Sequence, residues 1–257
     1  MSPSPPTPAS APSRKVADAL APLQLSGEHH LCPGCGHPVA WRLLLEVISE
    51  LDLASRAIGV VGHGCYTNIV SLADIDFLQC LHGRAPAVAT GVKRVQPGAA
   101  VFTIQGDGDV ASEGLAELLH AAARGERITV VMLNNGVFGD TGGQMTAASV
   151  LGQRTKTSLD GRQPDDHGYP VPVADLVAAL PGAAYVARGA VNNAGSIAKT
   201  KRYLKRAFQV SAEGQGFSFV EVLTMCPTGW FLPTADGPGY LEGTFEKTFP
   251  LGALKGS

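Results

Sequence analysis

The chain reads AVFTIQGDGDVASEGLAELLHAAARGERITVVMLNN from residue 100 to residue 135. Two near-continuous apolar runs, 100–104 and 128–133, flank a segment of helical character, 113–124, which is followed by Gly125. Such runs are typical of strands buried on both faces, and glycine commonly follows the last turn of a helix. The stretch therefore predicts a strand, a helix and a second strand parallel to the first, joined by a right-handed crossover.

Further segments continue this alternation of strands and helices. Apolar runs at 57–61 and 217–223 predict two more strands, and the segments 41–51 and 198–210 predict helices. Pro38 lies just upstream of the first of these helices, where an initial turn tolerates proline. The pattern predicts an α/β fold of three layers, in which a mostly parallel sheet carries helices on both faces. The segment 152–172 shows no period, so we expect a long loop that is functional or mobile.

Length and composition limit the domain organisation. A chain of 257 residues, 45% hydrophobic and 16% charged, is long enough for one large globular domain and marginal for two. Residues 2–13 are rich in Pro, Ser and Ala and lack the apolar core of a signal peptide. We therefore expect a disordered N-terminal arm over residues 1–24, a single domain over residues 25–257, and a cytoplasmic location.

Charge and hydropathy argue against two classes of partner. The formal net charge is −2 and no long run of Lys or Arg occurs, so neither nucleic acid nor an anionic membrane surface is expected to bind. No apolar run is long enough to cross a bilayer. The 31 glycines amount to about 12% of the chain, against a usual value of roughly 7%, which favours tight loops and close approaches of backbone to ligands.

The polar residues after the two central strands predict a magnesium-diphosphate site. Asp107 and Asn135 each follow a strand, and ligands of open α/β sheets bind at the carboxyl ends of the strands. Mg²⁺ prefers near-octahedral oxygen ligands, so the Asp107 carboxylate, the Asn135 side-chain carbonyl and a main-chain carbonyl such as that of Val137 form a suitable set. Gly106 and Gly108 let backbone amides approach the phosphates, at the positive end of the following helix.

A plainer interpretation of the segment 106–109 competes with this one. Short glycine and aspartate motifs are common, and the segment alone is equally compatible with a strand-to-helix turn in which an aspartate caps the helix. The Asn-Asn pair at 134–135, placed after the next strand, favours the metal site.

Four of the five cysteines stand in loops beside predicted helices or strands. Cys32 and Cys35 form a Cys-x-x-Cys unit, whereas Cys65 and Cys226 each follow a strand alone. Four thiolates match a cubane iron-sulfur cluster or a structural zinc ion, and a redox dithiol with two buried cysteines is a third interpretation. Zinc ribbons usually carry two short Cys-x-x-Cys knuckles, which this chain lacks. Cys80 lies in an apolar context and is expected to be a buried small side chain.

From Cys32 to Trp230 the chain resembles the thiamine-diphosphate-binding beta subunit of the 2-oxoacid:ferredoxin oxidoreductases. The resemblance rests on CPGCGH (32–37), HGRAPAVATG (82–91), GDGD (106–109), NN (134–135), TGGQ (141–144) and CPTGW (226–230). Several separate motifs in the same order make the resemblance specific.

The resemblance implies a thiamine-diphosphate-binding fold with three cofactors. Thiamine diphosphate and Mg²⁺ are expected at the sheet edge, with Asp107, Asn135 and Val137 as metal ligands. A proximal [4Fe-4S] cluster is expected on Cys32, Cys35, Cys65 and Cys226. The residues expected at the cofactors are Gly36, His37, Gly64, Cys65, His82, Gly106, Asp107, Gly108, Asp109, Asn135, Val137, Gly139, Asp140 and Thr141.

The same resemblance implies an activity and partners. The activity is CoA-dependent oxidative decarboxylation of a 2-oxo acid to an acyl-CoA and CO₂, with electrons passing through the cluster to ferredoxin. In the family, an alpha subunit supplies the pyrimidine-side domain and the glutamate that activates the cofactor, and gamma and ferredoxin-like subunits complete the enzyme. No second domain of that kind is recognisable in this sequence, so the chain is expected to act only with partner subunits.

Substrate and individual roles are less constrained. The stretches 82–95 and 152–162 most resemble the branched-chain, 2-oxoisovalerate type, but Asp140 stands where the family usually has Met. Aryl 2-oxo acids such as phenylglyoxylate and indolepyruvate, pyruvate and 2-oxoglutarate therefore stay open. His82 is the candidate catalytic residue, as a hydrogen-bond partner of the diphosphate or the substrate, and a purely structural role is equally compatible. Thr141 and Gln144 are candidates to contact the cofactor, or TGGQ is only a tight turn.

Two other classes of function remain in view. A non-oxidative thiamine-dependent decarboxylase would keep the magnesium motif without needing the four cysteines, and would normally carry both cofactor-binding domains in one chain. A zinc-stapled scaffold subunit would need the cysteines but not the pairing of Asp107 with Asn135.

Overall fold

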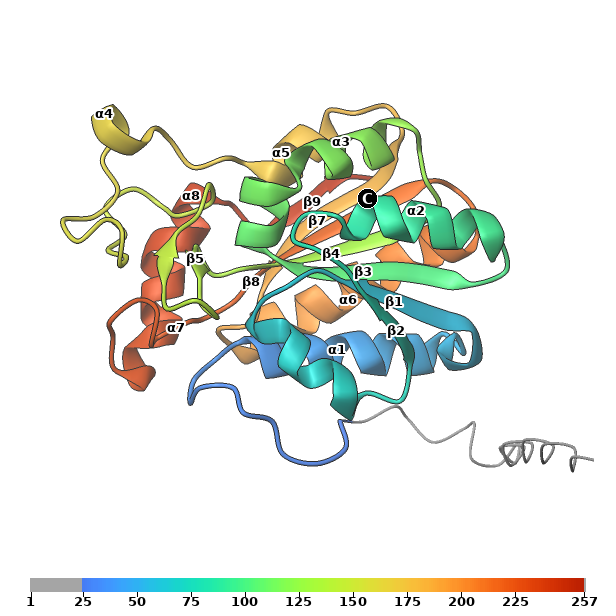
Figure 1. Cartoon of the computed structure of the whole chain (residues 1–257), viewed down its shortest axis with the longest axis horizontal. Coiled ribbons are helices and arrows are strands. Elements are labelled where there is room, and N and C mark those ends of the chain that lie inside the picture. Colours follow the sequence, from blue (N-terminus) through green and yellow to red (C-terminus); the bar gives the residue numbers. More distant parts are fainter. Residues whose placement is uncertain (1–24, 257) are drawn as a thin grey trace, which may run out of the picture.

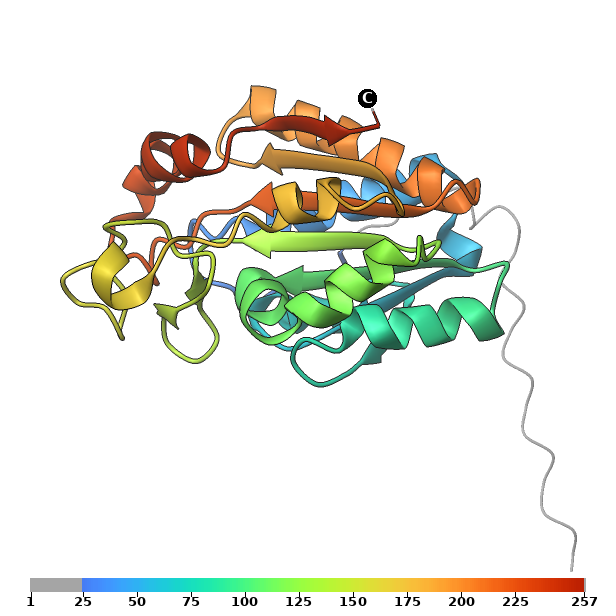
Figure 2. The same ribbon diagram turned by 90° about the horizontal axis from the view of Figure 1, so that it is seen from above.

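One seven-stranded sheet organises the chain, in the strand order β2-β1-β3-β4-β8-β7-β9. The structure, a computed structural model, describes residues 25–256, so the expected N-terminal arm, residues 1–24, lies outside the described residues. All neighbouring strands are parallel except β9, which runs antiparallel to β7 (Figure 2). The strands of the sheet are β1 (Ala57–Val61), β2 (Asp76–Gln79), β3 (Ala100–Gly106), β4 (Thr129–Asn134), β7 (Ala183–Ala190), β8 (Phe217–Leu223) and β9 (Gly252–Lys255).

Helices cover both faces of this sheet, which confirms the three-layer prediction (Figure 1). One face carries α1 (His37–Glu50) and α6 (Ala194–Ala212), and the other carries α2 (Ala85–Val95), α3 (Leu115–Ala123) and α5 (Val173–Ala178). The short helices α4 (Pro164–His167), α7 (Gly237–Tyr240) and α8 (Glu246–Thr248) lie beyond the carboxyl ends of the strands. Within residues 25–256, none of the helices combines the length and the apolar character needed to cross a membrane.

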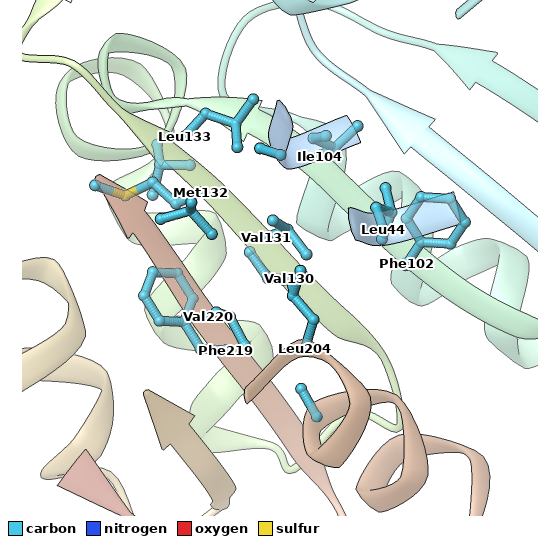
Figure 3. Close-up of a cluster of buried hydrophobic side chains, with 14 of the residues drawn as sticks. Leu44, Phe102, Ile104, Val130, Val131, Met132, Leu133, Leu204, Phe219 and Val220 are labelled. Carbon is cyan, nitrogen blue, oxygen red and sulfur yellow. The ribbon is translucent and has the colours of Figure 1, made fainter. Parts of the chain in front are cut away.

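The core lies between the sheet and the helices. Leu44 of α1, Phe102 of β3 and Leu204 of α6 are all fully buried and belong to one apolar cluster (Figure 3). Phe102 also packs against Phe208 of α6, with ring centroids 5.6 Å apart. Each such side chain contributes roughly 1.5–3 kcal/mol through its burial, so the central strands form a rigid support for the loops at their ends.

The predicted strands agree with the structure within two residues, but the helices differ at their starts. Helix α1 begins at His37 rather than at residue 41, because Pro38 already lies in its first turn. Helix α3 is shorter than predicted because Gly108–Glu113 forms a π-helical turn and Gly114 separates it from α3. Strands β2, β7 and β9 of the sheet were not predicted; β2 is a largely exposed edge strand without a continuous apolar run.

The segment 152–172 is a long loop with an organised interior. It contains α4, and the five N–H groups of the buried Arg162 guanidinium lie within hydrogen-bond distance of six main-chain carbonyls, three of which share Nη1: those of Thr146, Ala147, Ser149, His167, Gly168 and Tyr169. One side chain thus holds the two ends of the loop together. The loop lies at the carboxyl edge of the sheet, next to the C-terminal helices (Figures 1 and 2).

Candidate functional site

Asp107 and Asn135 lie side by side although 28 positions separate them in the sequence. The Asn135 main-chain amide donates to the Asp107 carboxylate at 3.3 Å, and the Thr146 hydroxyl donates to its other oxygen at 2.5 Å. The Asp107 side chain is buried, and burial raises its pKa to about 7, against the opposing effect of these hydrogen bonds. Of the charged partners in reach, Glu221 is also acidic and raises the pKa further. Asp107 is therefore a buried carboxylate whose hydrogen-bond and charged partners within residues 25–256 include no cationic side chain.

The turn that carries Asn135 is held from several sides. The Asn135 side-chain oxygen accepts a hydrogen bond from the Val137 amide at 3.1 Å, and its main-chain carbonyl accepts one from the Trp230 indole at 2.7 Å. Gly136 has a φ of +67°, and a Cβ there would collide with Gln153 and Phe245. Only glycine fits this position, which fixes the direction in which the Asn135 side chain leaves the strand.

Asp109 is buried, and it does not cap a helix. Its carboxylate accepts hydrogen bonds from the Tyr66 hydroxyl at 2.5 Å and from the Gly83 amide, and it stands 3.4 Å from the His82 Nδ1. The side chain of Asp107, the residue at the N-cap position of the π-helical turn, makes no capping bond either. The capping interpretation of the segment 106–109 is thus wrong for both aspartates.

A cavity at this edge is lined by thirteen of the fourteen residues that were expected at the cofactors. The exception is Gly36, whose amide donates to the Met225 carbonyl at 2.9 Å and whose Cα packs against Thr224 and Met225. The lining residues that were not in the expected set are His63, Tyr66 and Phe138. No spacing or motif marks Tyr66 or Phe138, so their place in the wall could not be predicted from the sequence.

Three histidines stand in the wall of this cavity. His82 packs edge-on against His63 with centroids 5.4 Å apart, and His63 Nε2 is 3.6 Å from the Asp140 carboxylate. His37 is buried, and burial lowers its pKa to about 4, so its imidazole is neutral. Its Nε2 lies 3.4 Å from the Asn135 side-chain nitrogen, whereas its Nδ1 is buried without a hydrogen-bond partner.

The four loop cysteines converge on a second cavity of about 460 Å³. Cys32 and Cys35 form a turn closed by the Cys35 amide on the Cys32 carbonyl at 3.1 Å. A Cβ added at Gly139 would lie 3.3 Å from the Cys65 sulfur and 3.9 Å from the Cys226 sulfur, so these two sulfurs face one point. Cys32, Cys35, Cys65 and Cys226 all line this cavity.

The thiols of Cys35, Cys65 and Cys226 are neutral in the absence of a metal. Burial raises the pKa of Cys35 to about 11 and those of Cys65 and Cys226 to about 12. The thiols also raise one another's pKa, because a thiolate at one position repels a thiolate at the next. Cys80 stands apart: its half-buried thiol donates to the Val61 carbonyl at 3.3 Å.

The two cavities are adjacent. Both are lined by His37, Cys65, Asn135, Gly139 and Asp140. The wall between the carboxylate site and the thiol site is therefore one residue thick, because each of these residues lines both cavities.

Thr141 and Gln144 differ in their placement. Thr141 lines the first cavity, whereas Gln144 does not. The Thr141 hydroxyl donates to the Gln144 side chain at 2.7 Å, and the Gln144 amide donates back to the Thr141 carbonyl at 2.9 Å. These bonds close the hairpin of β5 (Val137–Phe138) and β6 (Gln144–Met145), so the tight-turn interpretation describes TGGQ in this structure.

Comparison with known proteins identifies the family. The family described as thiamine pyrophosphate enzyme, C-terminal TPP binding domain, matches residues 62–222. The chain belongs to this family. The cavity that Asp107 and Asn135 line therefore lies in a thiamine-diphosphate-binding domain.

Relatives in the family are subunits of 2-oxoacid oxidoreductases, which confirms the resemblance seen in the motifs. The ketoisovalerate oxidoreductase subunit VorA of Methanothermobacter marburgensis is 39% identical over 222 residues, or 86% of this chain and 46% of the relative. The 2-oxoglutarate synthase subunit KorB of Archaeoglobus fulgidus is 32% identical over 216 residues, or 84% of this chain and 76% of the relative. The chain thus spans about half the length of the ketoisovalerate relatives that it matches.

A solved structure shares the fold. The 2-oxoglutarate:ferredoxin oxidoreductase from Magnetococcus marinus, with 2-oxoglutarate, coenzyme A and succinyl-CoA bound, superposes with a TM-score of 0.74. The superposition covers 96% of this chain and 87% of that chain at 24% identity.

Proposed function

We propose that the chain is the cofactor-binding subunit of an oxidoreductase that decarboxylates a 2-oxo acid, forms an acyl-CoA and passes the electrons to ferredoxin. The observation that carries this proposal is the shared wall between a buried carboxylate site and a site of four converging thiols. Electron transfer from an organic cofactor to a cluster requires such proximity. A non-oxidative decarboxylase would have no use for the thiols.

The first cavity would hold the diphosphate end of thiamine diphosphate through Mg²⁺. The proposed ligands are the Asp107 carboxylate, the Asn135 side-chain oxygen and the Val137 carbonyl, which are the hard oxygen donors that Mg²⁺ prefers. The fit is supported by the burial of Asp107 without a cationic partner, since a bound cation would stabilise its ionised form. When bound, thiamine diphosphate supplies the electron sink for decarboxylation.

The second cavity would hold a [4Fe-4S] cluster on Cys32, Cys35, Cys65 and Cys226. Four thiolates on one zinc ion at about 2.3 Å would lie about 3.8 Å from one another. Within residues 25–256, no three His, Cys, Asp or Glu side chains converge closely enough to share one ion. A cubane gives each thiolate its own iron corner, so the four sulfurs need not share one ion, and this favours the cluster over zinc.

Residues of the wall would orient the cofactors and the substrate. His82 lines the cavity, its Nδ1 lies 3.4 Å from the buried Asp109 carboxylate, and its side chain is one-third exposed, so we assign it a hydrogen bond to the diphosphate or the substrate. His37, neutral and lying against Asn135, would separate the two cofactors without adding charge. Gly36, on the Met225 backbone, would fix the Cys35 loop beside the Cys226 loop.

The proposed substrate is a branched-chain 2-oxo acid of the 2-oxoisovalerate type. The higher identity to the ketoisovalerate relatives, 39% against 32% for the 2-oxoglutarate relative, supports this choice. The proposed partners are an alpha subunit with the pyrimidine-side domain and the activating glutamate, gamma and ferredoxin-like subunits, and ferredoxin.

The test is metal, cofactor and turnover analysis of the complex, co-expressed with its partner subunits and purified without oxygen. We expect the Cys226→Ala complex to contain four iron and four sulfide ions per chain fewer than wild type. Cys80→Ala, which replaces the half-buried cysteine outside this cavity, is the matched control and should keep the wild-type content. Asp107→Ala should lose thiamine diphosphate and keep this iron. Acyl-CoA formation should be fastest with 2-oxoisovalerate in a panel of aryl and aliphatic 2-oxo acids. Zinc in place of iron, or CoA-independent aldehyde release, would contradict the proposal.

A further inference from the structure

A row of buried polar side chains crosses the sheet beneath the Asn135 turn. Asn134 of β4, Glu221 of β8 and Arg188 of β7 stand on adjacent strands, and each is at most 1% exposed. Arg188 Nε donates to one Glu221 oxygen at 2.7 Å, and the Asn134 side-chain nitrogen donates to the other at 2.7 Å. None of the three lines either cavity.

This row determines which way the Asn134 amide points. Both Glu221 oxygens accept hydrogen bonds, one from Arg188 and one from Asn134, so the NH₂ group of Asn134 faces Glu221. The Asn134 oxygen is thereby turned to the Gly136 amide, which it meets at 3.1 Å, while the Asn134 main-chain carbonyl accepts from the Thr224 amide at 2.8 Å. A reversed amide would place NH₂ against the Gly136 N–H and remove this hydrogen bond from the turn.

Arg188 in turn holds the Glu221 carboxylate in place. Besides Glu221, its guanidinium donates to the partly exposed Asp175 at 2.6 Å and to the Pro250 carbonyl at 3.0 Å. It also lies 5.4 Å over the Phe249 ring. Glu221 is thus fixed by Arg188 on one side and by Asn134 on the other.

Stability alone does not account for an ion pair at this depth. Replacing a buried ion pair by apolar residues of similar volume is often neutral or stabilising, because removing two charges from water is costly. The hydrogen bond that links the pair to the turn 134–137 is the one donated by the Asn134 amide.

We infer that Glu221, held by Arg188, is a positioning residue for the cofactor site. Through Asn134 it fixes the turn 134–137, and so sets the direction of the Asn135 side chain and the affinity for Mg²⁺-thiamine diphosphate. This inference rests on the proposed function, since it concerns the same cavity. Glu221 lines neither cavity; its hydrogen bond with Asn134 acts through the backbone of the turn, and its charge also raises the pKa of Asp107.

The test compares variants of the heteromeric complex depleted of thiamine diphosphate. Calorimetric titration with thiamine diphosphate in excess Mg²⁺ gives the dissociation constant, and iron content is measured in parallel. Glu221→Gln, whose amide also offers NH₂ to Asn134, should raise the dissociation constant at least tenfold with iron unchanged. Asp175→Asn is the matched control: it removes the other carboxylate partner of Arg188, and should leave the dissociation constant within twofold.

A double variant separates positioning from folding. Arg188→Met with Glu221→Leu removes both buried charges, and we expect a melting temperature near that of wild type with the dissociation constant still raised at least tenfold. Wild-type affinity in a stably folded double variant would overturn the inference and leave the proposed function intact. If the wild-type complex itself bound no thiamine diphosphate, the proposed function and the inference would both be overturned.

Discussion

The indole nitrogen of Trp230 donates a 2.7 Å hydrogen bond to the main-chain carbonyl of Asn135. Trp230 is buried against Tyr240 and Phe245, with ring centroids 4.9 Å and 5.2 Å away. The C-terminal helices are thereby attached to the turn that carries the proposed metal ligand.

Trp230→Phe should weaken both the fold and the site. The variant keeps the ring packing but leaves a buried carbonyl unpaired, which costs about 1–3 kcal/mol of unfolding free energy. Urea denaturation measures this loss, and calorimetry should show weaker thiamine diphosphate binding. Phe231→Leu, an exposed neighbour, is the control and should change neither quantity. An unchanged unfolding free energy in Trp230→Phe would mean that the hydrogen bond is not formed in solution.

Thr146 is expected to hold the Asp107 carboxylate in the orientation that a metal requires. Thr146→Val removes the hydroxyl that donates to Asp107, whereas Thr146→Ser retains it. A hydrogen bond to a charged group contributes about 1.5–3 kcal/mol, so Mg²⁺ should bind the valine variant roughly tenfold to a hundredfold more weakly. The serine variant should bind nearly as wild type. Equal affinities in the two variants would show that the Thr146 hydroxyl does not position the Asp107 carboxylate.

Arg162 is expected to be the main support of the loop 152–172. Arg162→Gln cannot reach all of the six carbonyls that the guanidinium binds, and the free energy of unfolding should fall by about 3 kcal/mol or more. Limited proteolysis should cut the loop faster. Arg154→Gln, which loses a single exposed hydrogen bond to the Leu159 carbonyl, should behave as wild type. A protease-resistant Arg162→Gln variant would refute this role.

A surface ion cluster between α1 and α6 should make a small pH-dependent contribution to stability. The hydrogen bond from Lys201 lowers the pKa of Glu46 from 4.5, and Lys201 also lowers that of Glu50. A lowered carboxyl pKa adds stability above pH 4.5 that is lost as the pH falls through the folded-state value. Lys201→Met should therefore lower the free energy of unfolding by less than about 1 kcal/mol at pH 7, because Lys201 and its two carboxylate partners are partly exposed. Melting curves from pH 7 to 3 should show the difference vanish in acid.

Gly139 is expected to leave room for the cluster. In Gly139→Ala the new methyl group would lie 3.3 Å from the Cys65 sulfur, inside the space that the thiols surround. Iron content should drop to less than half of wild type. Gly91→Ala, at an open position in α2, is the control and should stabilise the chain by roughly 1 kcal/mol with full iron content. Full iron in Gly139→Ala would place the cluster elsewhere.

Proximity that depends only on strand order could be predicted from the sequence. Asp107 and Asn135 come after neighbouring parallel strands, so the topology alone brings them together. The gathering of Cys65 and Cys226 at one edge has the same origin, because β1 and β8 end on the same side as β3 and β4.

Contacts between single side chains of distant segments could not be predicted, because they leave no pattern in the sequence. Thr146 reaches Asp107 across 39 positions, and Glu221 reaches Asn134 across 87. A threonine in a loop and a glutamate inside an apolar strand have no periodic neighbours that would reveal their partners. Arg162 likewise lies in a segment without a period, although it organises that segment.

The wall shared by the two cavities has an evolutionary consequence. A substitution at His37, Asn135 or Gly139 alters the lining of both cavities at once, so under the proposed function a change of substrate through these positions would also change the surroundings of the proposed cluster. Adaptation is freer at His63 and Phe138, which border the first cavity alone. Diversification of substrate range should therefore start at residues that line the first cavity alone and spare the residues that line both cavities.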